Sequence, residues 1–196
     1  MTIVAIGTYP GRAALGTVRI SGPDTLHLLK QFLRPRKSSF SFAENPRVLT
    51  LCDLVDLQGS VVDESMTVFY KAQASYTGED SAELTLHGNP IILRKAVEVL
   101  CSTGARLAEP GEFTSRAFRN GRMDLTKAES VLQLIDARSE YELSAARKLM
   151  GGELSRTISK FRSALIGLKA ETEAEVDFST EDLTFESLAK RKSRVK

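Results

Sequence analysis

"GEFTSRAFRNGRMDL", residues 111–125, marks the point where the pattern of the chain changes. Before it, short apolar segments rich in β-branched residues are separated by Gly and Pro, which is typical of a sheet with intervening helices. After it, two long segments have helical periodicity and almost no breaking residues. The stretch itself carries three arginines, Arg116, Arg119 and Arg122. A plain linker does not need so many anion-binding groups, so we expect a functional junction here.

The part before the junction is predicted to be an α+β domain with a mixed sheet, covering residues 1–118. Two apolar segments flank a short turn at Gly59 and predict a β-hairpin. Pro23 suits the first position of a helix, and Asp24 favours its positively polarised end. Gly104 is expected to close a later helix. Strands are predicted at 2–8, 16–22, 47–56, 60–70 and 81–88, and helices at 21–33 and 89–104.

The part after the junction, residues 119–196, is predicted to be an incomplete helical domain. A capping box from Thr126 to Glu129 is expected to start a helix that runs to about Met150. A second helix is expected after Gly151 and Gly152, and a third after Thr184. Apolar side chains in the second helix are spaced as a seam for packing against other helices: Leu154, Ile158, Phe161, Leu165 and Leu168.

Composition limits the class of protein. The 27 basic and 25 acidic residues leave a net charge of +2, which is too small to argue for nucleic-acid binding by itself. No apolar run approaches 18 residues, so we expect no membrane span, and the N-terminus lacks the pattern of a signal peptide. The two cysteines, Cys52 and Cys101, have no metal-site spacing. Buried, reduced thiols in a cytoplasmic protein are the simplest interpretation.

Common catalytic motifs are absent from the sequence. No Gly-Lys pair occurs, which excludes a P-loop, and "GRAALGTV" (11–18) more simply shapes a connection between two strands. His27 and His87 have no Ser or Cys partner by spacing, so both are expected to be structural or solvated. Metal ligands are not clustered, and no metal site is predicted.

Three charged residues stand in unusual places. Arg19 lies in the middle of a predicted strand, where a guanidinium group is costly unless it is paired or binds an anion. Glu79 follows Gly78 in a loop, and Arg122 follows Gly121 at the junction. One carboxylate and two guanidinium groups could form a pocket for a ligand with a donor edge and carboxylates. From spacing alone, internal salt bridges explain them equally well.

These residues also lie in motifs that resemble a known family. "TIVAIGTYPGR…GTVRISGP", "SYTGEDSAEL…HGNP", "GARLAEPGEFTSRAFRNGRMDLTKAE" and "AEVDF" resemble the N-terminal part of the tRNA modification GTPases called MnmE or TrmE. The resemblance covers most of residues 1–183. The motif "RLAEPGEFTxRAFxNGxxDLxxAE" is long and highly specific.

The resemblance implies a fold and a function. Such proteins have an N-terminal domain related to folate-dependent one-carbon enzymes, which binds 5-formyltetrahydrofolate or another reduced one-carbon folate and forms a homodimer. A helical domain follows, into which a GTPase domain dependent on Mg²⁺ and K⁺ is inserted. With the flavoprotein MnmG, the family modifies the wobble uridine of certain tRNAs. The family's folate contacts correspond to Arg19, Glu79 and Arg122. The sequence stops before the GTPase domain, so we expect neither GTP binding nor hydrolysis from it.

The sequence departs from the family pattern at three places. The usual "PGRGGVG" is "PGRAALG" here, so Ala13 and Ala14 require negative φ angles where the family has glycine. "HGGP" has become "HGNP", and Asn89 tolerates the left-handed region. The position of Arg122 is commonly Lys. Two other interpretations stay open: a stand-alone folate protein resembling aminomethyltransferases, and a pure dimerisation module that has lost its ligand.

Overall fold

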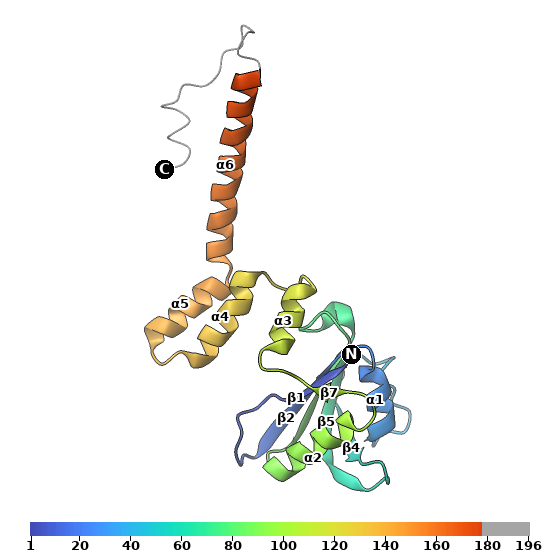
Figure 1. Ribbon diagram of the computed structural model, residues 1–196. Helices are drawn as coiled ribbons and strands as arrows, with labels where there is room; N and C mark the ends of the chain where they lie inside the picture. The colour runs from blue at the N-terminus through green and yellow to red at the C-terminus, as the bar shows by residue number, and fades with distance from the viewer. Residues whose placement is uncertain (178–196) are drawn as a thin grey trace. The chain divides into compact units, whose positions relative to one another are not determined.

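The computed structural model describes residues 1–177, which fall into two compact units (Figure 1). The first unit is Met1–Met123, and the second begins at Asp124. The boundary expected at residue 118 lies within helix α3, Glu112–Arg119, which belongs to the first unit.

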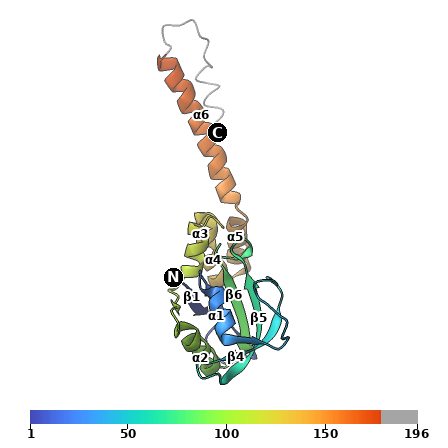
Figure 2. The same cartoon turned by 90° about the vertical axis from the view of Figure 1, so that its right-hand side faces the viewer.

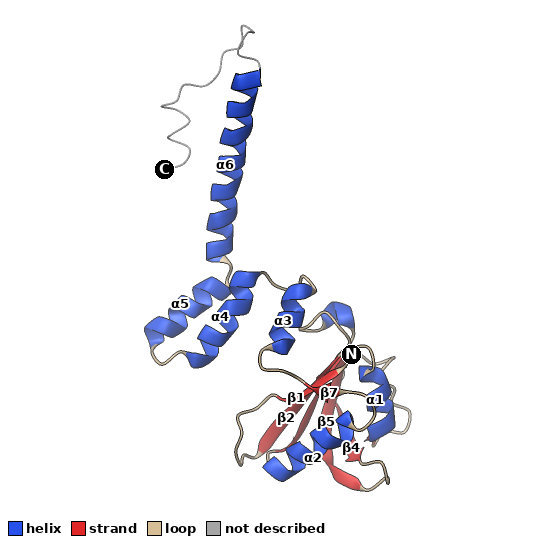
Figure 3. Ribbon diagram, viewed as in Figure 1, coloured by secondary structure: helices blue, strands red, loops and turns tan. Residues whose placement is uncertain are grey.

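A seven-stranded sheet forms the framework of the first unit (Figure 3). The strand order is β3-β4-β5-β6-β2-β1-β7. Only β1 and β7 pair in parallel, and all other neighbours are antiparallel, which confirms the predicted mixed sheet and the α+β class. The strands are β1 Ile3–Ile6, β2 Leu15–Ser21, β3 Leu33–Pro35, β4 Thr50–Val55, β5 Val61–Tyr70, β6 Ser81–His87 and β7 Arg106–Leu107.

Helices α1 (Thr25–Phe32) and α2 (Pro90–Cys101) lie beside the sheet (Figures 1 and 2). Apolar side chains of both helices belong to the same buried core as those of the strands. Alternation along β2 buries Val18 and Ile20 completely, whereas Arg19 between them is exposed. The free-energy cost of burying the Arg19 guanidinium group does not arise, because its side chain projects from the other face of the strand. The core comes from both helices and the central strands: Val4, Val18, Ile20, Leu28, Leu29, Phe32, Leu54, Phe69, Leu84, Leu86, Leu93, Ala96 and Leu100.

Several local features differ from the expectations. The hairpin is confirmed, since β4 pairs with β5 and Gly59 has a φ of +82°. The first helix begins at Thr25 rather than at Pro23, with Asp24 as its N-cap. Strands β3 and β7 and the 3₁₀ turn Ala72–Ala74 were not predicted. All three are too short to show a period, and pairing with neighbouring strands defines β3 and β7.

The second unit starts with two adjacent helices, α4 (Leu125–Asp136) and α5 (Glu140–Met150). The predicted capping box is wrong, because the carboxylate of Asp124 accepts the bond from the Lys127 N–H at 2.8 Å. The predicted single helix is also wrong. The Ser139 hydroxyl caps a new helix, because it accepts a hydrogen bond from the N–H of Glu142 at 3.2 Å. The helix is therefore interrupted between α4 and α5, although no Gly or Pro lies between them.

Helix α6 spans Glu153–Asp177 and confirms the predicted second long helix (Figure 2). Its apolar seam is exposed: Leu154 by 43%, Ile158 by 54%, Phe161 by 51% and Leu165 by 45%. Among the described residues, about half of the surface of each of these side chains is left open to solvent. The third predicted helix, after Thr184, lies outside the described residues. None of the described helices is both long and apolar enough to cross a membrane.

The two cysteines are free thiols in different surroundings. Cys52 is fully buried on β4, and burial raises the pKa of its thiol to about 11. Cys101 is partly buried, and burial raises its thiol pKa as well. Both thiols are therefore protonated at neutral pH, which makes them poor nucleophiles.

A histidine on β6 gives the first unit a pH-dependent contact. His87 Nδ1 lies 2.7 Å from an oxygen of Asp63, and this hydrogen bond raises the pKa of His87 above its usual value. Because protonated His87 is stabilised in the folded state, the contact adds its full contribution to stability below the unfolded pKa of ~6.5. This contribution is lost as the pH rises through the higher pKa of the folded state. We expect the melting temperature of the parent to fall between pH 6 and 8 relative to His87→Gln.

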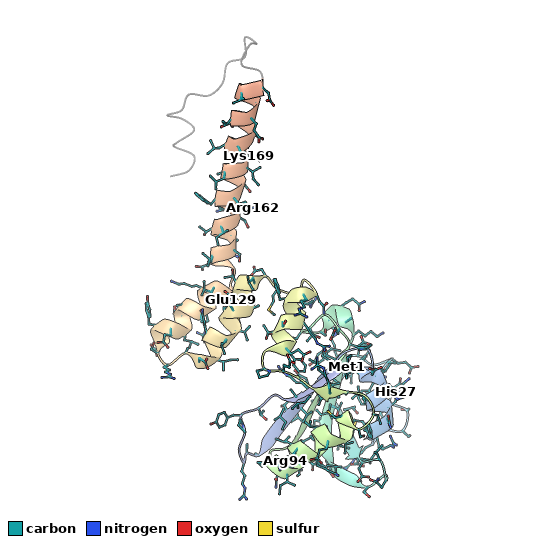
Figure 4. All side chains as sticks on the ribbon, in the orientation of Figure 1. Met1, His27, Arg94, Glu129, Arg162 and Lys169 are labelled. Carbon is teal, nitrogen blue, oxygen red and sulfur yellow. The ribbon has the colours of Figure 1, made fainter. Side chains whose placement is uncertain are left out.

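His27 provides the control for this measurement. It is an exposed histidine on α1, labelled in Figure 4, and makes no ion pair within residues 1–177. Thermal melts of the parent, His87→Gln and His27→Gln at several pH values therefore isolate the contact. Equal pH profiles for the parent and His87→Gln would show that the His87–Asp63 pair is not held in solution.

Candidate functional site

Arg19 is paired across the sheet rather than with Glu79. It lies directly opposite Glu83 of β6, and its Nη2 is 2.9 Å from Glu83 Oε1. The two side chains are 46% and 36% exposed, so the pair is accessible to solvent and screened by it. Beside Arg19 lies a cavity of about 240 Å³ lined mostly by apolar and aromatic side chains, including Tyr70, Tyr76 and Phe113. Arg19 is thus a charged group at the wall of an aromatic cavity.

Glu79 is fixed by a closed ring of hydrogen bonds. Its backbone N–H donates to Thr77 Oγ1 at 3.3 Å, and its Oε2 accepts from the Ser21 hydroxyl at 2.9 Å. The hydroxyls of Ser21 and Thr77 are 2.6 Å apart, and both side chains are buried. Thr77 can therefore donate to Ser21, which donates to the carboxylate. The ring holds the loop containing Glu79 to the end of β2.

Arg116 of α3 contacts the same carboxylate. Its Nη1 donates to Glu79 Oε2 at 2.8 Å, and its Nε and Nη2 donate to Glu112 Oε1 at 3.3 and 2.9 Å. Glu112 in turn accepts two bonds from Arg106 of β7, at 2.8 and 2.6 Å. The bonds from Arg106 are the main reason that the pKa of Glu112 falls to about 2. This charged ladder lines a second, polar cavity of about 540 Å³.

Arg122 is brought against the Glu79 loop by two close contacts. Asn120 donates to the Thr77 carbonyl at 2.7 Å, and the Arg122 N–H donates to the carbonyl of Ala117 at 2.8 Å. A Cβ on Gly78 would lie 2.9 Å from Asn120 Cβ and 3.2 Å from Arg122 Cγ, so only glycine allows this approach. Arg122 forms no ion pair within the described part of the chain. Its guanidinium group is therefore available to an anionic ligand.

The structure brings the three candidate residues to one region without placing them in one cavity. Arg19 and Thr77 line the aromatic cavity, Glu79 lines the polar one, and the side chain of Arg122 lies beside Gly78. The salt-bridge interpretation holds for Arg19 and Glu79, each of which has a partner of its own. Sequence reasoning singled out Arg116 as a charged group of the junction but did not pair it with Glu79. It missed the other residues that support Glu79, namely Ser21, Thr77, Arg106 and Glu112. Only Glu112 and Arg116, four residues apart on one helix, left a local signal.

The family described as "GTP-binding protein TrmE N-terminus" matches residues 2–122, and the family described as "MnmE helical domain" matches residues 125–196. The chain belongs to the MnmE family. Its first part matches the N-terminal domain of this family, and its second part matches the family's helical domain.

Similar proteins come from several bacteria. The "tRNA modification GTPase MnmE" of Leptospira biflexa is 48% identical over 99% of this chain. The proteins of the same name from Aquifex aeolicus and Thermotoga maritima are 47% and 42% identical over 92% of it. The chain spans 42% of the Leptospira relative and 39% of the other two.

The departures from the family pattern have local explanations. Among the described residues only Arg47 has a positive φ outside glycine, so Ala13 and Ala14 sit in the loop without backbone strain. The loop is tied by the Ala13 N–H, which donates to the Gly88 carbonyl at 2.9 Å. Asn89 does not use the left-handed region. It is extended and caps α2, because its Oδ1 accepts from the Ile91 N–H at 2.9 Å.

Proposed function

We propose that this chain is the N-terminal part of a tRNA-modifying GTPase, in which the first unit, residues 1–123, binds 5-formyltetrahydrofolate and forms a homodimer. The family match over residues 2–122 supports the assignment. The observation that carries it is the Glu79 carboxylate, which is held firmly by Ser21 and Arg116 and yet is 29% exposed at a cavity. A fixed, accessible carboxylate suits a ligand edge with neighbouring N–H donors, as a reduced pterin has.

Each candidate residue receives a role from its chemistry. Glu79 accepts the N–H donors of the pterin. Arg122, which has no ionic partner in residues 1–177, binds a carboxylate of the glutamyl tail or the formyl oxygen. Arg19, at the wall of the aromatic cavity, also binds a carboxylate of the tail or the formyl oxygen, and it keeps its ion pair with Glu83. The aromatic side chains Tyr76 and Phe113 offer apolar surface for a ring system.

The activity of the whole protein extends this proposal. Together with the flavoprotein MnmG, the full-length protein would modify wobble uridine in tRNA in the cytoplasm. Hydrolysis of GTP by the GTPase domain, which depends on Mg²⁺ and K⁺, would drive the conformational change that the modification needs. The unit that begins at Asp124 would carry that domain as the start of the helical domain.

Calorimetric titration of 5-formyltetrahydrofolate into the purified chain tests the ligand assignment. We expect saturable binding with a stoichiometry near one per chain. Titration of GTP into the same protein serves as the control and should give no saturable heat. Absence of folate binding would contradict the assignment and favour a pure interaction module.

Self-association is a separate prediction. Because the first unit is proposed to form the homodimer, light scattering at tens of micromolar should give about twice the chain mass of 21.5 kDa. The measurement is repeated with saturating 5-formyltetrahydrofolate to reveal any coupling between ligand and dimer. A monomer under both conditions would show that residues 1–196 do not suffice for dimerisation.

A further inference from the structure

The two oxygens of the Glu79 carboxylate have different surroundings. Oε2 accepts from the Ser21 hydroxyl at 2.9 Å and from Arg116 Nη1 at 2.8 Å. Within residues 1–177, no protein group donates to Oε1. An ionised carboxylate offers about two acceptor sites on each oxygen, so Oε2 is filled by the protein. A ligand with N–H donors therefore finds its free acceptor at Oε1.

Arg116 is itself immobilised, which is what allows it to orient another side chain. Its side chain is only 14% exposed. Besides Glu79, it donates to Glu112 and, through Nη2, to the Met1 carbonyl at 3.0 Å. Met1 is labelled in Figure 4. A guanidinium fork fixed on several sides presents a donor to Glu79 in one geometry, at little further cost in side-chain entropy.

Glu112 completes the support. It is 14% exposed, and besides the bonds from Arg116 it accepts two from Arg106 and one from the Glu109 backbone N–H at 2.9 Å. The chain of contacts thus runs from β7 through Glu112 and Arg116 to the Glu79 loop. Two carboxylates balance the partly buried Arg116, so the charge is compensated before any ligand arrives.

We propose that Arg116 is a positioning residue for ligand binding in this site. It holds the Glu79 carboxylate by Oε2 and leaves Oε1 for the N–H donors of the ligand. The inference rests on the proposed role of Glu79 in binding a reduced folate. Arg116 acts through Glu79 and does not need to touch the ligand. Ser21 shares this task through its hydrogen bond, whereas Glu112 acts one step further away by fixing Arg116.

A purely structural role is the competing explanation for Arg116. The same bonds join Met1, α3 and the loop from Thr77 to Glu79, so their loss could loosen the unit as a whole. The two explanations differ in one respect. If Arg116 acts through Glu79, removing Arg116 matters little once Glu79 is already replaced. If it acts through general stability, the two losses add.

A double-mutant cycle on affinity for 5-formyltetrahydrofolate decides between them. The proteins are the parent, Arg116→Gln, Glu79→Gln, the double variant, and Arg94→Gln as a control that removes an exposed arginine on α2. Ligand-observed NMR extends the measurement to millimolar dissociation constants, so the weakest variants remain measurable. Thermal melts confirm that each protein is folded at the temperature used.

We expect Arg116→Gln to weaken binding by ~10-fold to 100-fold in the parent and by less than ~3-fold in the Glu79→Gln protein. Arg116→Lys should recover part of the loss, because an ammonium group can still donate to Oε2. Equal losses in both backgrounds, or parental affinity in Arg116→Gln, would overturn the positioning role. Parental affinity in Glu79→Gln, or no binding by the parent, would instead overturn the proposed ligand site.

Discussion

Glu79→Gln is expected to weaken binding of 5-formyltetrahydrofolate by at least ~30-fold. Removing one partner of a desolvated charged contact costs about 2–5 kcal/mol, or roughly 30-fold to several-thousand-fold in affinity. The amide keeps the shape of the side chain, but one of its ends becomes a donor. In one orientation the amide NH₂ group faces Ser21 and Arg116, which both donate to Glu79 Oε2 in the parent. In the other orientation it faces the N–H donors of the ligand. Donors oppose donors in both cases, and a hydrogen bond is lost.

Arg122→Lys provides the comparison for this experiment. The family resemblance implies lysine at this position, and an ammonium group keeps the charge while losing the planar fork. We therefore expect a smaller loss, within about 10-fold, measured by the same calorimetry. If Glu79→Gln bound like the parent while Arg122→Lys lost more, the pocket would be centred on the arginine and not on the carboxylate.

Gly22→Ala should give a large loss of stability in the first unit, because Gly22 combines a positive φ with a close backbone neighbour. Gly22 follows β2 with a φ of +138°, and a Cβ there would lie 2.6 Å from the Cα of Thr2. The neighbour is backbone and has no rotamer to change, so the strand end must shift. We expect the free energy of unfolding to fall by at least about 2 kcal/mol, from the backbone conformation and the clash together.

Two other glycines separate these contributions. Gly59 has a φ of +82° but open space around the position of its Cβ, so Gly59→Ala reports the cost of the backbone conformation alone. Gly11 has neither feature, and Gly11→Ala should change stability by less than about 1 kcal/mol. Urea unfolding of the three variants gives the comparison. A Gly22→Ala protein no less stable than Gly59→Ala would show that the contact with Thr2 is not tight in solution.

Much of the first unit could be predicted because its elements carry local signals. The strand ending at Ser21 alternates buried and exposed residues, and Gly59 marks a hairpin turn. Strands β3 and β7 could not be predicted in this way, since pairing with neighbours and not their own pattern makes them strands.

The errors in the second unit have a different cause. Ser139 and Glu142 form the same Ser-x-x-Glu signature that was assigned at Thr126, so the break between α4 and α5 was readable from the sequence. The apolar pattern continues across this break, which is why it predicts a single helix. The first helix of this unit is capped by Asp124, two residues before Thr126, because its carboxylate accepts the Lys127 N–H.

The candidate site shows the limit of sequence reasoning most clearly. Arg19, Glu79 and Arg122 were identified from odd placement and family resemblance, but their partners were not. The Arg116–Glu79 bond joins residues separated by 37 positions, and the Ser21–Glu79 bond joins residues separated by 58. Contacts of this kind depend on the packing of α3 and β2 around the loop and leave no periodic signal.

Amide chemical-shift mapping tests the central claim that a reduced folate binds beside Glu79. ¹⁵N-labelled protein is titrated with 5-formyltetrahydrofolate, and shifts are followed residue by residue. We expect the largest changes at Ser21, Thr77, Glu79 and Arg122, and little change on the exposed face of α2 around Arg94. Saturable shifts that cluster elsewhere, or no shifts at millimolar ligand, would contradict it.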